Sequence, residues 1–272
     1  MNEPISHVLL DIEGTTCPVS FVNGTLFPYA ARELGSYLER RRDDAQVRSL
    51  VDAVIEGWQQ DPDPQAQKLL QEAREQVSQR EGNESAIRSV SHLNGELIEP
   101  YLQWLIATDR KFTPLKELQG MVWQEGYARG DLIGTLFEEV ADTLRQWHKQ
   151  GLVLGVYSSG SIAAQKLLYG HSQAGDLRPL FSHWFDTHIG SKQDVDSYKR
   201  ICEAMGAKPQ HVLFVSDSEE ELQAASAAKL QLAYSNREDH PAQEQTEPYE
   251  HPIAIEGVRY INNLTQIKPG NP

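Results

Sequence analysis

Acidic side chains stand directly after two apolar runs in the sequence. Asp11 and Glu13 follow Val8–Leu10, and Asp217 follows the apolar part of HVLFVSDS. Charges seldom end a buried segment without partners. A carboxylate such as Asp11 can attack phosphorus and form an acyl-phosphate. Asp11 and Asp217 also offer the hard oxygen ligands that Mg²⁺ prefers, and the cation would offset the repulsion between carboxylate and phosphate.

The stretch YSSGS, residues 157–161, offers groups that bind phosphate. Ser159 is expected to hold phosphate oxygens together with Lys192, which precedes a predicted helix. The backbone N–H groups of Gly160 and Ser161 open another predicted helix, and a helix N-terminus favours anions. These residues extend the predicted phosphoryl-transfer site.

Each of these groups also has a structural alternative. Asp11 alone fits a turn cap, the serines fit a helix N-cap, and Lys192 fits a solvated surface position. The groups nevertheless occur in one chain order, each just after a predicted strand or before a predicted helix. That order favours a shared site, in which Glu13 is placed to shuttle a proton.

Alternating strand and helix patterns would bring these groups together. Short strand patterns occur at 5–10, 152–157, 183–190, 211–218 and 231–236. Helical patterns lie between them, for example at 137–151, where Val140, Leu144 and Trp147 share a face. This alternation predicts an α/β fold, a doubly wound parallel sheet with helices on both faces. Ligands bind such sheets beyond the carboxyl ends of the strands.

A long stretch from about 24 to 128 has helical patterns and no clear strand. In 25–40, for example, Phe27, Ala30, Leu34 and Leu38 recur at steps of three and four. We therefore expect an all-helical cap domain at 21–129, inserted after the first strand. The α/β catalytic core would comprise 1–20 and 130–272.

The composition restricts the function classes. The 272 residues carry a formal charge of −14, which argues against nucleic-acid and anionic-membrane partners. Two cysteines, no signal-peptide pattern and no apolar run of membrane-spanning length indicate a cytoplasmic protein. A monomer is expected, because no unpaired apolar face is evident.

Four motifs resemble those of haloacid dehalogenase-like phosphatases. DIEGT, starting at Asp11, is similar to their first motif, DxDGT, with Glu13 at the second acidic position. VYSSGS places Ser159 at the phosphate-binding position, and SKQDVDSY supplies Lys192. FVSDSEEE supplies Asp217, with Glu221 at its second acidic place; Ser216 is a mild departure. The helical insertion matches the place of a cap domain in that superfamily.

Longer segments resemble one family within it, the enolase-phosphatases of methionine salvage. They are LDIEGTTCPVSFVNGTLFPYA, DRKFTPLKELQGMVWQEGY and VYSSGSIAAQKLLYGH. The resemblance implies conversion of a small phosphorylated diketone, 2,3-diketo-5-methylthiopentyl-1-phosphate, to an acireductone and phosphate. It implies one Mg²⁺ per subunit, a nucleophile and metal ligand at Asp11, and an acid/base and metal-associated residue at Glu13. It also implies a metal ligand at Asp217 and substrate contacts at Ser158, Ser159 and Lys192.

Several alternatives stay open at this point. The alternatives are a phosphatase for another small phosphate ester, a dehalogenase, and a protein that binds Mg²⁺ or phosphate without catalysis; an intact Asp11 argues against the last. The enolisation base is Glu13 or a cap residue. The cap is expected to close over the site and exclude water. Lys111, Lys116 and Gln119 are candidates for contacts to the diketone or methylthio end, and a solvated helix face is the alternative.

Overall fold

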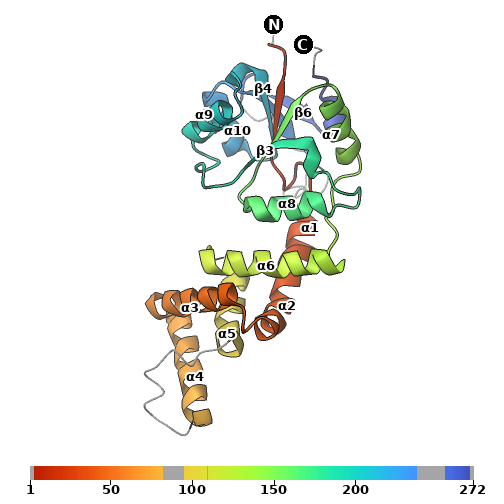
Figure 1. Cartoon of the computed structure of the whole chain (residues 1–272). Helices are drawn as coiled ribbons and strands as arrows, with labels where there is room; N and C mark the ends of the chain where they lie inside the picture. Colours follow the sequence, from red (N-terminus) through yellow and green to blue (C-terminus); the bar gives the residue numbers. More distant parts are fainter. Residues whose placement is uncertain (1–2, 82–94, 109, 238–254, 270–272) are drawn as a thin grey trace, which may run out of the picture. The chain divides into compact units, whose positions relative to one another are not determined.

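The computed structural model describes residues 3–81, 95–108, 110–237 and 255–269. The chain forms two compact units, drawn together in Figure 1: Met1–Thr25 with Gly130–Pro272, and Leu26–Arg129. The chain thus crosses between units after residue 25, where the sequence analysis placed the boundary after residue 20. A π-helical turn, Val22–Leu26 (η1), contains this boundary, and a short helix, Val19–Phe21 (α1), precedes it in the first unit.

The first unit is built on a six-stranded parallel sheet in the order β3-β2-β1-β4-β5-β6. The strands are His7–Leu10 (β1), Val153–Tyr157 (β2), Phe181–Phe185 (β3), Val212–Ser216 (β4), Gln231–Ser235 (β5) and Arg259–Ile261 (β6). Nearly every residue of the central strands β1 and β4 is buried, as expected for parallel strands covered on both faces. The predicted α/β fold is confirmed.

The strand register aligns the ends from which the polar loops leave. Leu10 of β1 pairs with Val156 of β2 on one side and with Val215 of β4 on the other. On the far side of β2, Tyr157 pairs with Phe185 of β3. The loops that follow these four strands therefore start at the same edge of the sheet.

Helices cover both faces of this sheet. They are Val140–Lys149 (α7), Ile162–Gly170 (α8), Val195–Ala204 (α9) and Glu219–Ala227 (α10). Figure 1 shows α9 and α10 on one side of the sheet and α7 on the other. Tyr198 and Ile201 of α9 and Leu222 of α10 pack with Leu9 and Phe214 in one buried apolar cluster. This cluster anchors α9, which follows the loop after β3, and α10, which follows the loop after β4.

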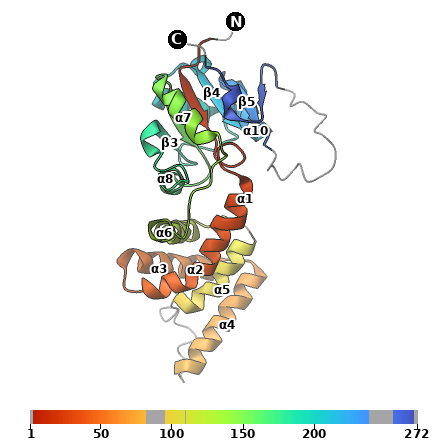
Figure 2. The same ribbon diagram turned by 90° about the vertical axis from the view of Figure 1, so that its right-hand side faces the viewer.

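The second unit contains only helices in its described part. They are Phe27–Arg40 (α2), Ala45–Gln60 (α3), Pro64–Glu81 (α4), Gly95–Ala107 (α5) and Thr113–Arg129 (α6). Figure 2 shows α2 beside α5, a pair that also shares many contacts. Residues 82–94 of the stretch predicted to be helical lie outside the described residues. Helix α3 begins at an N-cap, because the Asp44 side chain accepts from the backbone N–H groups of Gln46 and Val47.

A buried aromatic group organises this helical unit. Trp58 is fully buried, its indole N–H donates to the Ala66 carbonyl at 2.8 Å, and its ring stacks on Tyr101 at 4.7 Å between centroids. The Tyr101 hydroxyl donates to Asp61 at 2.9 Å, and Arg110 pairs with the same carboxylate at 3.0 Å. These contacts join α3, α4, α5 and the segment before α6.

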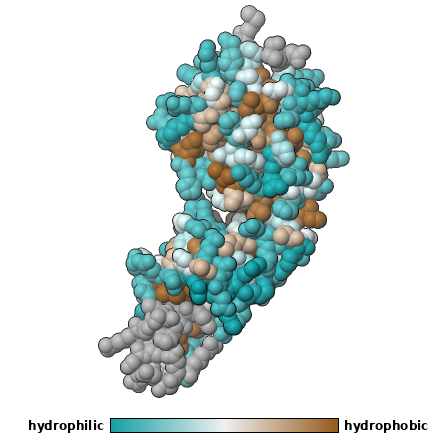
Figure 3. Space-filling model, in the orientation of Figure 1, coloured by the Kyte–Doolittle hydropathy of each residue, from teal (hydrophilic) through white to brown (hydrophobic). Residues whose placement is uncertain are grey.

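The surface is largely hydrophilic on the face that Figure 3 shows, with apolar residues in separate patches. Among the described residues, Ile133 and Tyr260 are large apolar side chains with high exposure. No helix in the described part of the chain is both long and apolar enough to cross a membrane.

We expect Trp58→Ala to lower the free energy of unfolding by about 3–5 kcal/mol, because it leaves a cavity and removes the indole hydrogen bond to the Ala66 carbonyl. Urea denaturation followed by circular dichroism measures the change. Lys68→Ala, on the exposed face of α4, is the control and should change stability by less than about 0.5 kcal/mol. Equal effects of both substitutions would contradict the role given to Trp58.

Candidate active site

Asp11 lies where the strand order changes direction. From β1 the sheet continues to β2 and β3 on one side and to β4, β5 and β6 on the other. This is the topological switch point at which open α/β sheets bind ligands. Asp11 directly follows β1 and is only 5% exposed, while Asp217 directly follows the neighbouring β4. The structure thus places two of the predicted carboxylates at adjacent strand ends.

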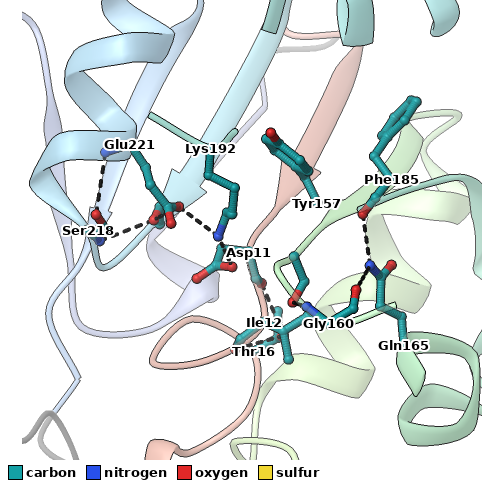
Figure 4. Close-up of polar contacts among 12 residues, drawn as sticks. Asp11, Ile12, Thr16, Tyr157, Gly160, Gln165, Phe185, Lys192, Ser218 and Glu221 are labelled. Atoms are coloured by element: carbon teal, nitrogen blue, oxygen red, sulfur yellow. Dashed lines mark hydrogen bonds and ion pairs between the residues drawn. The ribbon is translucent and has the colours of Figure 1, made fainter. Parts of the chain in front are cut away.

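Lys192 lies between two carboxylates at this edge, as Figure 4 shows. Its Nζ is 2.5 Å from Asp11 Oδ1 and 2.7 Å from Glu221 Oε2. Burial alone would lower the pKa of Lys192, but the Asp11 and Glu221 carboxylates outweigh burial and raise it. Lys192 is therefore a fixed positive charge at neutral pH.

The backbone around Lys192 is held by two tyrosines. The Tyr198 hydroxyl donates to the Lys192 carbonyl at 2.6 Å, and the Tyr157 hydroxyl donates to the Gly190 carbonyl at 2.9 Å. The Lys192 ammonium also lies 5.8 Å from the centre of the Tyr157 ring. Contacts from β2 and α9 thus direct this lysine toward Asp11.

Glu221 lies in the first turn of α10 and closes the same ion-pair cluster. Its carboxylate accepts from the Ser216 hydroxyl at 2.9 Å as well as from Lys192. Burial, followed by the nearby Asp11 charge, raises the pKa of Glu221 to about 7. Ser216, a departure from the common motif, therefore orients the second acid of that motif.

Asp217 packs against the turn that follows Asp11. Gly14 has a φ of 65°, and a Cβ built at this glycine would lie 2.6 Å from Asp217 Cγ. Only glycine fits there, because any side chain would collide with the carboxylate. Burial, followed by the Asp11 and Glu221 charges, raises the pKa of Asp217 to about 8.

The chemistry of this donor set fits a magnesium ion. Asp11, Asp217 and Glu221 place three carboxyl groups beside one lysine, and burial together with the Asp11 and Glu221 charges disfavours ionisation of Asp217 when no cation is bound. Within the described residues, no group of three His, Cys, Asp or Glu side chains is arranged to hold a metal by itself. Mg²⁺ is commonly held by one or two carboxylates together with substrate phosphate and waters. Asp11 and Asp217 meet that requirement.

The loop after β2 is held by its neighbours. Ser158 is buried, and its hydroxyl accepts from the Gly160 N–H at 3.2 Å. The Gln165 amide donates to the carbonyls of Gly160 and Phe185, both at 2.8 Å (Figure 4). Ser159 is exposed between these anchored residues. Substrate contacts by Ser158 and Ser159 stay predictions.

The remaining predicted residues differ in their surroundings. Glu13 is half-buried in the turn after β1, and its role as acid/base and metal-associated residue stays a prediction. Lys111 and Lys116 are exposed in the helical unit, whereas Gln119 is buried in α6. Burial makes Gln119 less available to a ligand than the two lysines.

Sequence reasoning missed two positioning groups. Asp186 directly follows β3, as Asp11 follows β1, so its position after a strand was a usable signal. Its carboxylate accepts from the N–H groups of Ile162 at 3.2 Å and His188 at 3.0 Å, which fixes the start of α8. Arg237 lies in a polar tail segment without any motif. It is 3% exposed, and it donates to the Thr15 carbonyl at 2.7 Å.

The sheet and its strand-end carboxylates are those of a haloacid dehalogenase-like hydrolase, and a family model of that description matches residues 5–229. An enolase-phosphatase E1 of Synechococcus sp. strain CC9902 is 49% identical over 92% of this chain and 96% of the relative. One from Drosophila grimshawi is 43% identical over 82% of this chain and 83% of the relative. The chain belongs to the enolase-phosphatase family and is a phosphoric monoester hydrolase.

Two solved structures share the fold of this chain. The crystal structure of the UTR4 protein from Saccharomyces cerevisiae superposes with a TM-score of 0.68 at 28% identity, covering 97% of this chain and 100% of that chain. A dehalogenase structure has a TM-score of 0.50 at 16% identity, covering 98% of this chain and 96% of that chain. The second likeness shows the shared fold alone.

We expect the metal-free protein to lose stability as pH rises from about 5 to about 8. The folded state raises the pKa of Glu221 from 4.5 and of Asp217 from 3.8, so it binds protons more tightly than the unfolded chain. The stability that these two groups contribute is therefore fully present when the pH is below their unfolded-state pKa values. It is lost as the pH rises through their folded-state pKa values. Melting temperatures measured in EDTA across this range check the slope.

Glu221→Gln is the matched control for this titration. It removes one titrating carboxyl and one neighbouring charge, so the melting temperature should fall less steeply with pH. Adding Mg²⁺ should raise the wild-type melting temperature more at pH 8 than at pH 5, because the ion competes with protons. If the melting temperatures of the variant and the wild type changed equally with pH, Glu221 would not be a source of the pH dependence.

Proposed function

We propose that the chain is a Mg²⁺-dependent enolase-phosphatase of methionine salvage. It converts 2,3-diketo-5-methylthiopentyl-1-phosphate to the acireductone 1,2-dihydroxy-3-keto-5-methylthiopentene and phosphate. The observation that carries the proposal is the buried Asp11 carboxylate, paired with Lys192 at 2.5 Å and adjacent to Asp217 at the switch point. Membership in the enolase-phosphatase family supports the choice of substrate.

In the phosphatase step, an Asp11 oxygen attacks phosphorus and the bond from phosphorus to the ester oxygen breaks. Glu13 gives a proton to the departing oxygen, and an aspartyl-phosphate remains. A water molecule then attacks phosphorus, Glu13 takes its proton, and the phosphate is released with Asp11 regenerated. Lys192 holds Asp11 in place and offers positive charge to the phosphate oxygens.

Mg²⁺ bound by Asp11 and Asp217 would act as a Lewis acid that neutralises phosphate charge and polarises a substrate oxygen. Ser158 and Ser159 would contact the phosphate from the loop after β2. The end of that loop next to α8 is fixed, because Gln165 donates to the Gly160 carbonyl and Asp186 accepts from the Ile162 N–H. Fixed donors stabilise developing charge without reorganisation during the reaction.

In the enolisation step, which precedes dephosphorylation, a base removes a proton from the carbon next to a carbonyl group. The C–H electron pair forms the C=C bond, and the carbonyl oxygen takes up a proton to give the enol. Lys192 is not that base, because Asp11 and Glu221 raise its pKa and keep it protonated. Glu13 is our candidate, and a residue of the helical unit is the alternative. Asp217 and Glu221 are less suited, since one would hold the metal and the other is paired with Lys192.

An assay with the diketone phosphate tests the proposal directly. Phosphate release and the ultraviolet absorbance of the enol product are followed together, with Mg²⁺ and after its removal by EDTA. We expect both signals with Mg²⁺ and loss of phosphate release without it. Phosphate release from other esters, with no enol from the diketone, would show a phosphatase with a different substrate.

Asp11→Asn should reduce phosphate release by at least about 10³-fold, because an amide does not form the acyl-phosphate. Initial rates at saturating substrate measure the loss. Asp194→Asn, which alters an N-cap on the exposed start of α9, is the matched control and should stay within about 2-fold of the wild type. Full turnover by Asp11→Asn would refute the proposed mechanism.

Glu13→Asp tests whether catalysis depends on the length of the Glu13 side chain. Its side chain is one methylene shorter, and an acid must come within about 3 Å of its target. We expect one partial reaction, enol formation or phosphate release, to slow by about 10-fold or more. Single-turnover traces of absorbance and phosphate resolve the two steps. If enol formation and phosphate release both kept their rates, the length of the Glu13 side chain would not matter for catalysis.

A further inference from the structure

The turn after β1 is gripped by residues from outside it. We define loop 1 as Asp11–Cys17. Three successive carbonyls of loop 1 accept from other segments: Gly14 from the Ser235 hydroxyl at 2.9 Å, Thr15 from Arg237 Nη2 at 2.7 Å, and Thr16 from the Phe137 N–H at 3.1 Å. The peptide planes just after Glu13 are thus fixed from outside.

Two of these three donors come from the C-terminal part of the chain. Ser235 ends β5 and Arg237 follows two residues later, both beyond residue 229, where the match to the hydrolase family model ends. Arg237 is 3% exposed, so its guanidinium requires a carboxylate partner. Burial lowers the pKa of Arg237, and Glu139 opposes that shift.

The two terminal nitrogens of the Arg237 guanidinium bind different partners. Nη1 pairs with Glu139 at 2.6 Å and donates to the Asn262 carbonyl at 2.9 Å, while Nη2 donates to the Thr15 carbonyl. Its plane lies over the Phe137 ring, 4.3 Å from the centroid. A lysine ammonium is a point charge without the planar set of donors of a guanidinium. It can form the ion pair with Glu139 but cannot also hold the Thr15 carbonyl of loop 1 in the same way.

We infer that Arg237 is a positioning residue for the phosphatase reaction: through the Thr15 carbonyl it holds loop 1 so that Asp11 and Glu13 keep their catalytic geometry. The inference rests on the proposed role of Asp11 as nucleophile. A misplacement of reacting groups by about 1 Å can cost two orders of magnitude in rate. An effect on kcat is therefore expected without direct contact to the substrate.

Arg237→Lys is the principal test. It keeps the charge opposite Glu139 and removes the two-armed contact. We expect kcat to fall by about 10-fold or more while KM stays within about 2-fold, because the loss falls on the transition state. Arg259→Lys is the matched control, since it makes the same change in the same part of the chain, where Arg259 donates to Gln231 at 2.9 Å and not to loop 1.

Inhibition by vanadate and by phosphate provides a second readout. Vanadate adopts the five-coordinate geometry of phosphoryl transfer, and transition-state mimics report positioning more sharply than ground-state ligands. Arg237→Lys should weaken vanadate inhibition by about the same factor as kcat and phosphate inhibition by less than about 2-fold. Equal weakening of both inhibitors would overturn the inference.

Glu139→Gln separates positioning from stability. It removes the partly buried ion pair but keeps an acceptor for Arg237, so stability should fall while kcat stays within about 2-fold of the wild type. Equal kcat losses in Glu139→Gln and Arg237→Lys would show a stability effect and overturn the inference. If Arg237→Lys does not fold, Ser235→Ala removes the Gly14 contact and should still lower kcat; an unchanged kcat there would also overturn it.

Failure of the inference and failure of the proposed mechanism give different results. An active Asp11→Asn variant would remove the mechanism on which the inference rests. An inactive Asp11→Asn variant, together with wild-type kcat and vanadate inhibition in Arg237→Lys, would leave the mechanism intact and refute the positioning role alone.

Discussion

The ion-pair cluster of Lys192, Asp11 and Glu221 is the interaction on which the site depends. A buried carboxylate without a partner is costly, and the lysine between two acids satisfies both. Burial, followed by the Asp11 and Glu221 charges, raises the pKa of Asp217, so this third carboxyl group is not satisfied by the single lysine. A site of this kind is suited to a divalent cation, which would bind the carboxylates, and to a phosphate, which would bind the cation and the lysine.

The fold brings these groups together from distant parts of the sequence. Asp11 follows β1, Asp217 follows β4, and the aligned ends of parallel strands make them neighbours. Helix α10 then presents Glu221 from its first turn, and Tyr198 of α9 fixes the backbone at Lys192. The apolar cluster beneath α9 and α10 therefore supports the electrostatic cluster above it.

Loop 1 is the other half of the site, and its shape depends on close packing. Gly14 adopts a positive φ so that the turn can lie against Asp217. The carbonyls that follow are held by β5, by Arg237 and by the start of the segment leading to α7. The chain thus uses its C-terminal part, outside the span of the family model, to brace the loop that carries the nucleophile.

Local patterns were enough to predict the α/β fold and the strand ends that carry Asp11 and Asp217. An apolar run followed by an acid is a short-range signal, and the alternation of strands and helices determines where such ends meet. The insertion's helical character was also readable, although α3 was not singled out. Contacts between distant segments were not readable: Glu221 was named without its partner Lys192, and Arg237 carries no local signal for its contact with Thr15.

The central claim is that Asp11 becomes phosphorylated during turnover. Rapid mixing of enzyme, Mg²⁺ and diketone phosphate, followed by acid quenching, peptic digestion and mass spectrometry, tests it most directly. We expect a transient phosphoryl group on the peptide containing Asp11, localised to that residue and absent from the Asp11→Asn variant. Phosphate release at the normal rate from an enzyme that never carries a phosphoryl group on Asp11 would contradict it.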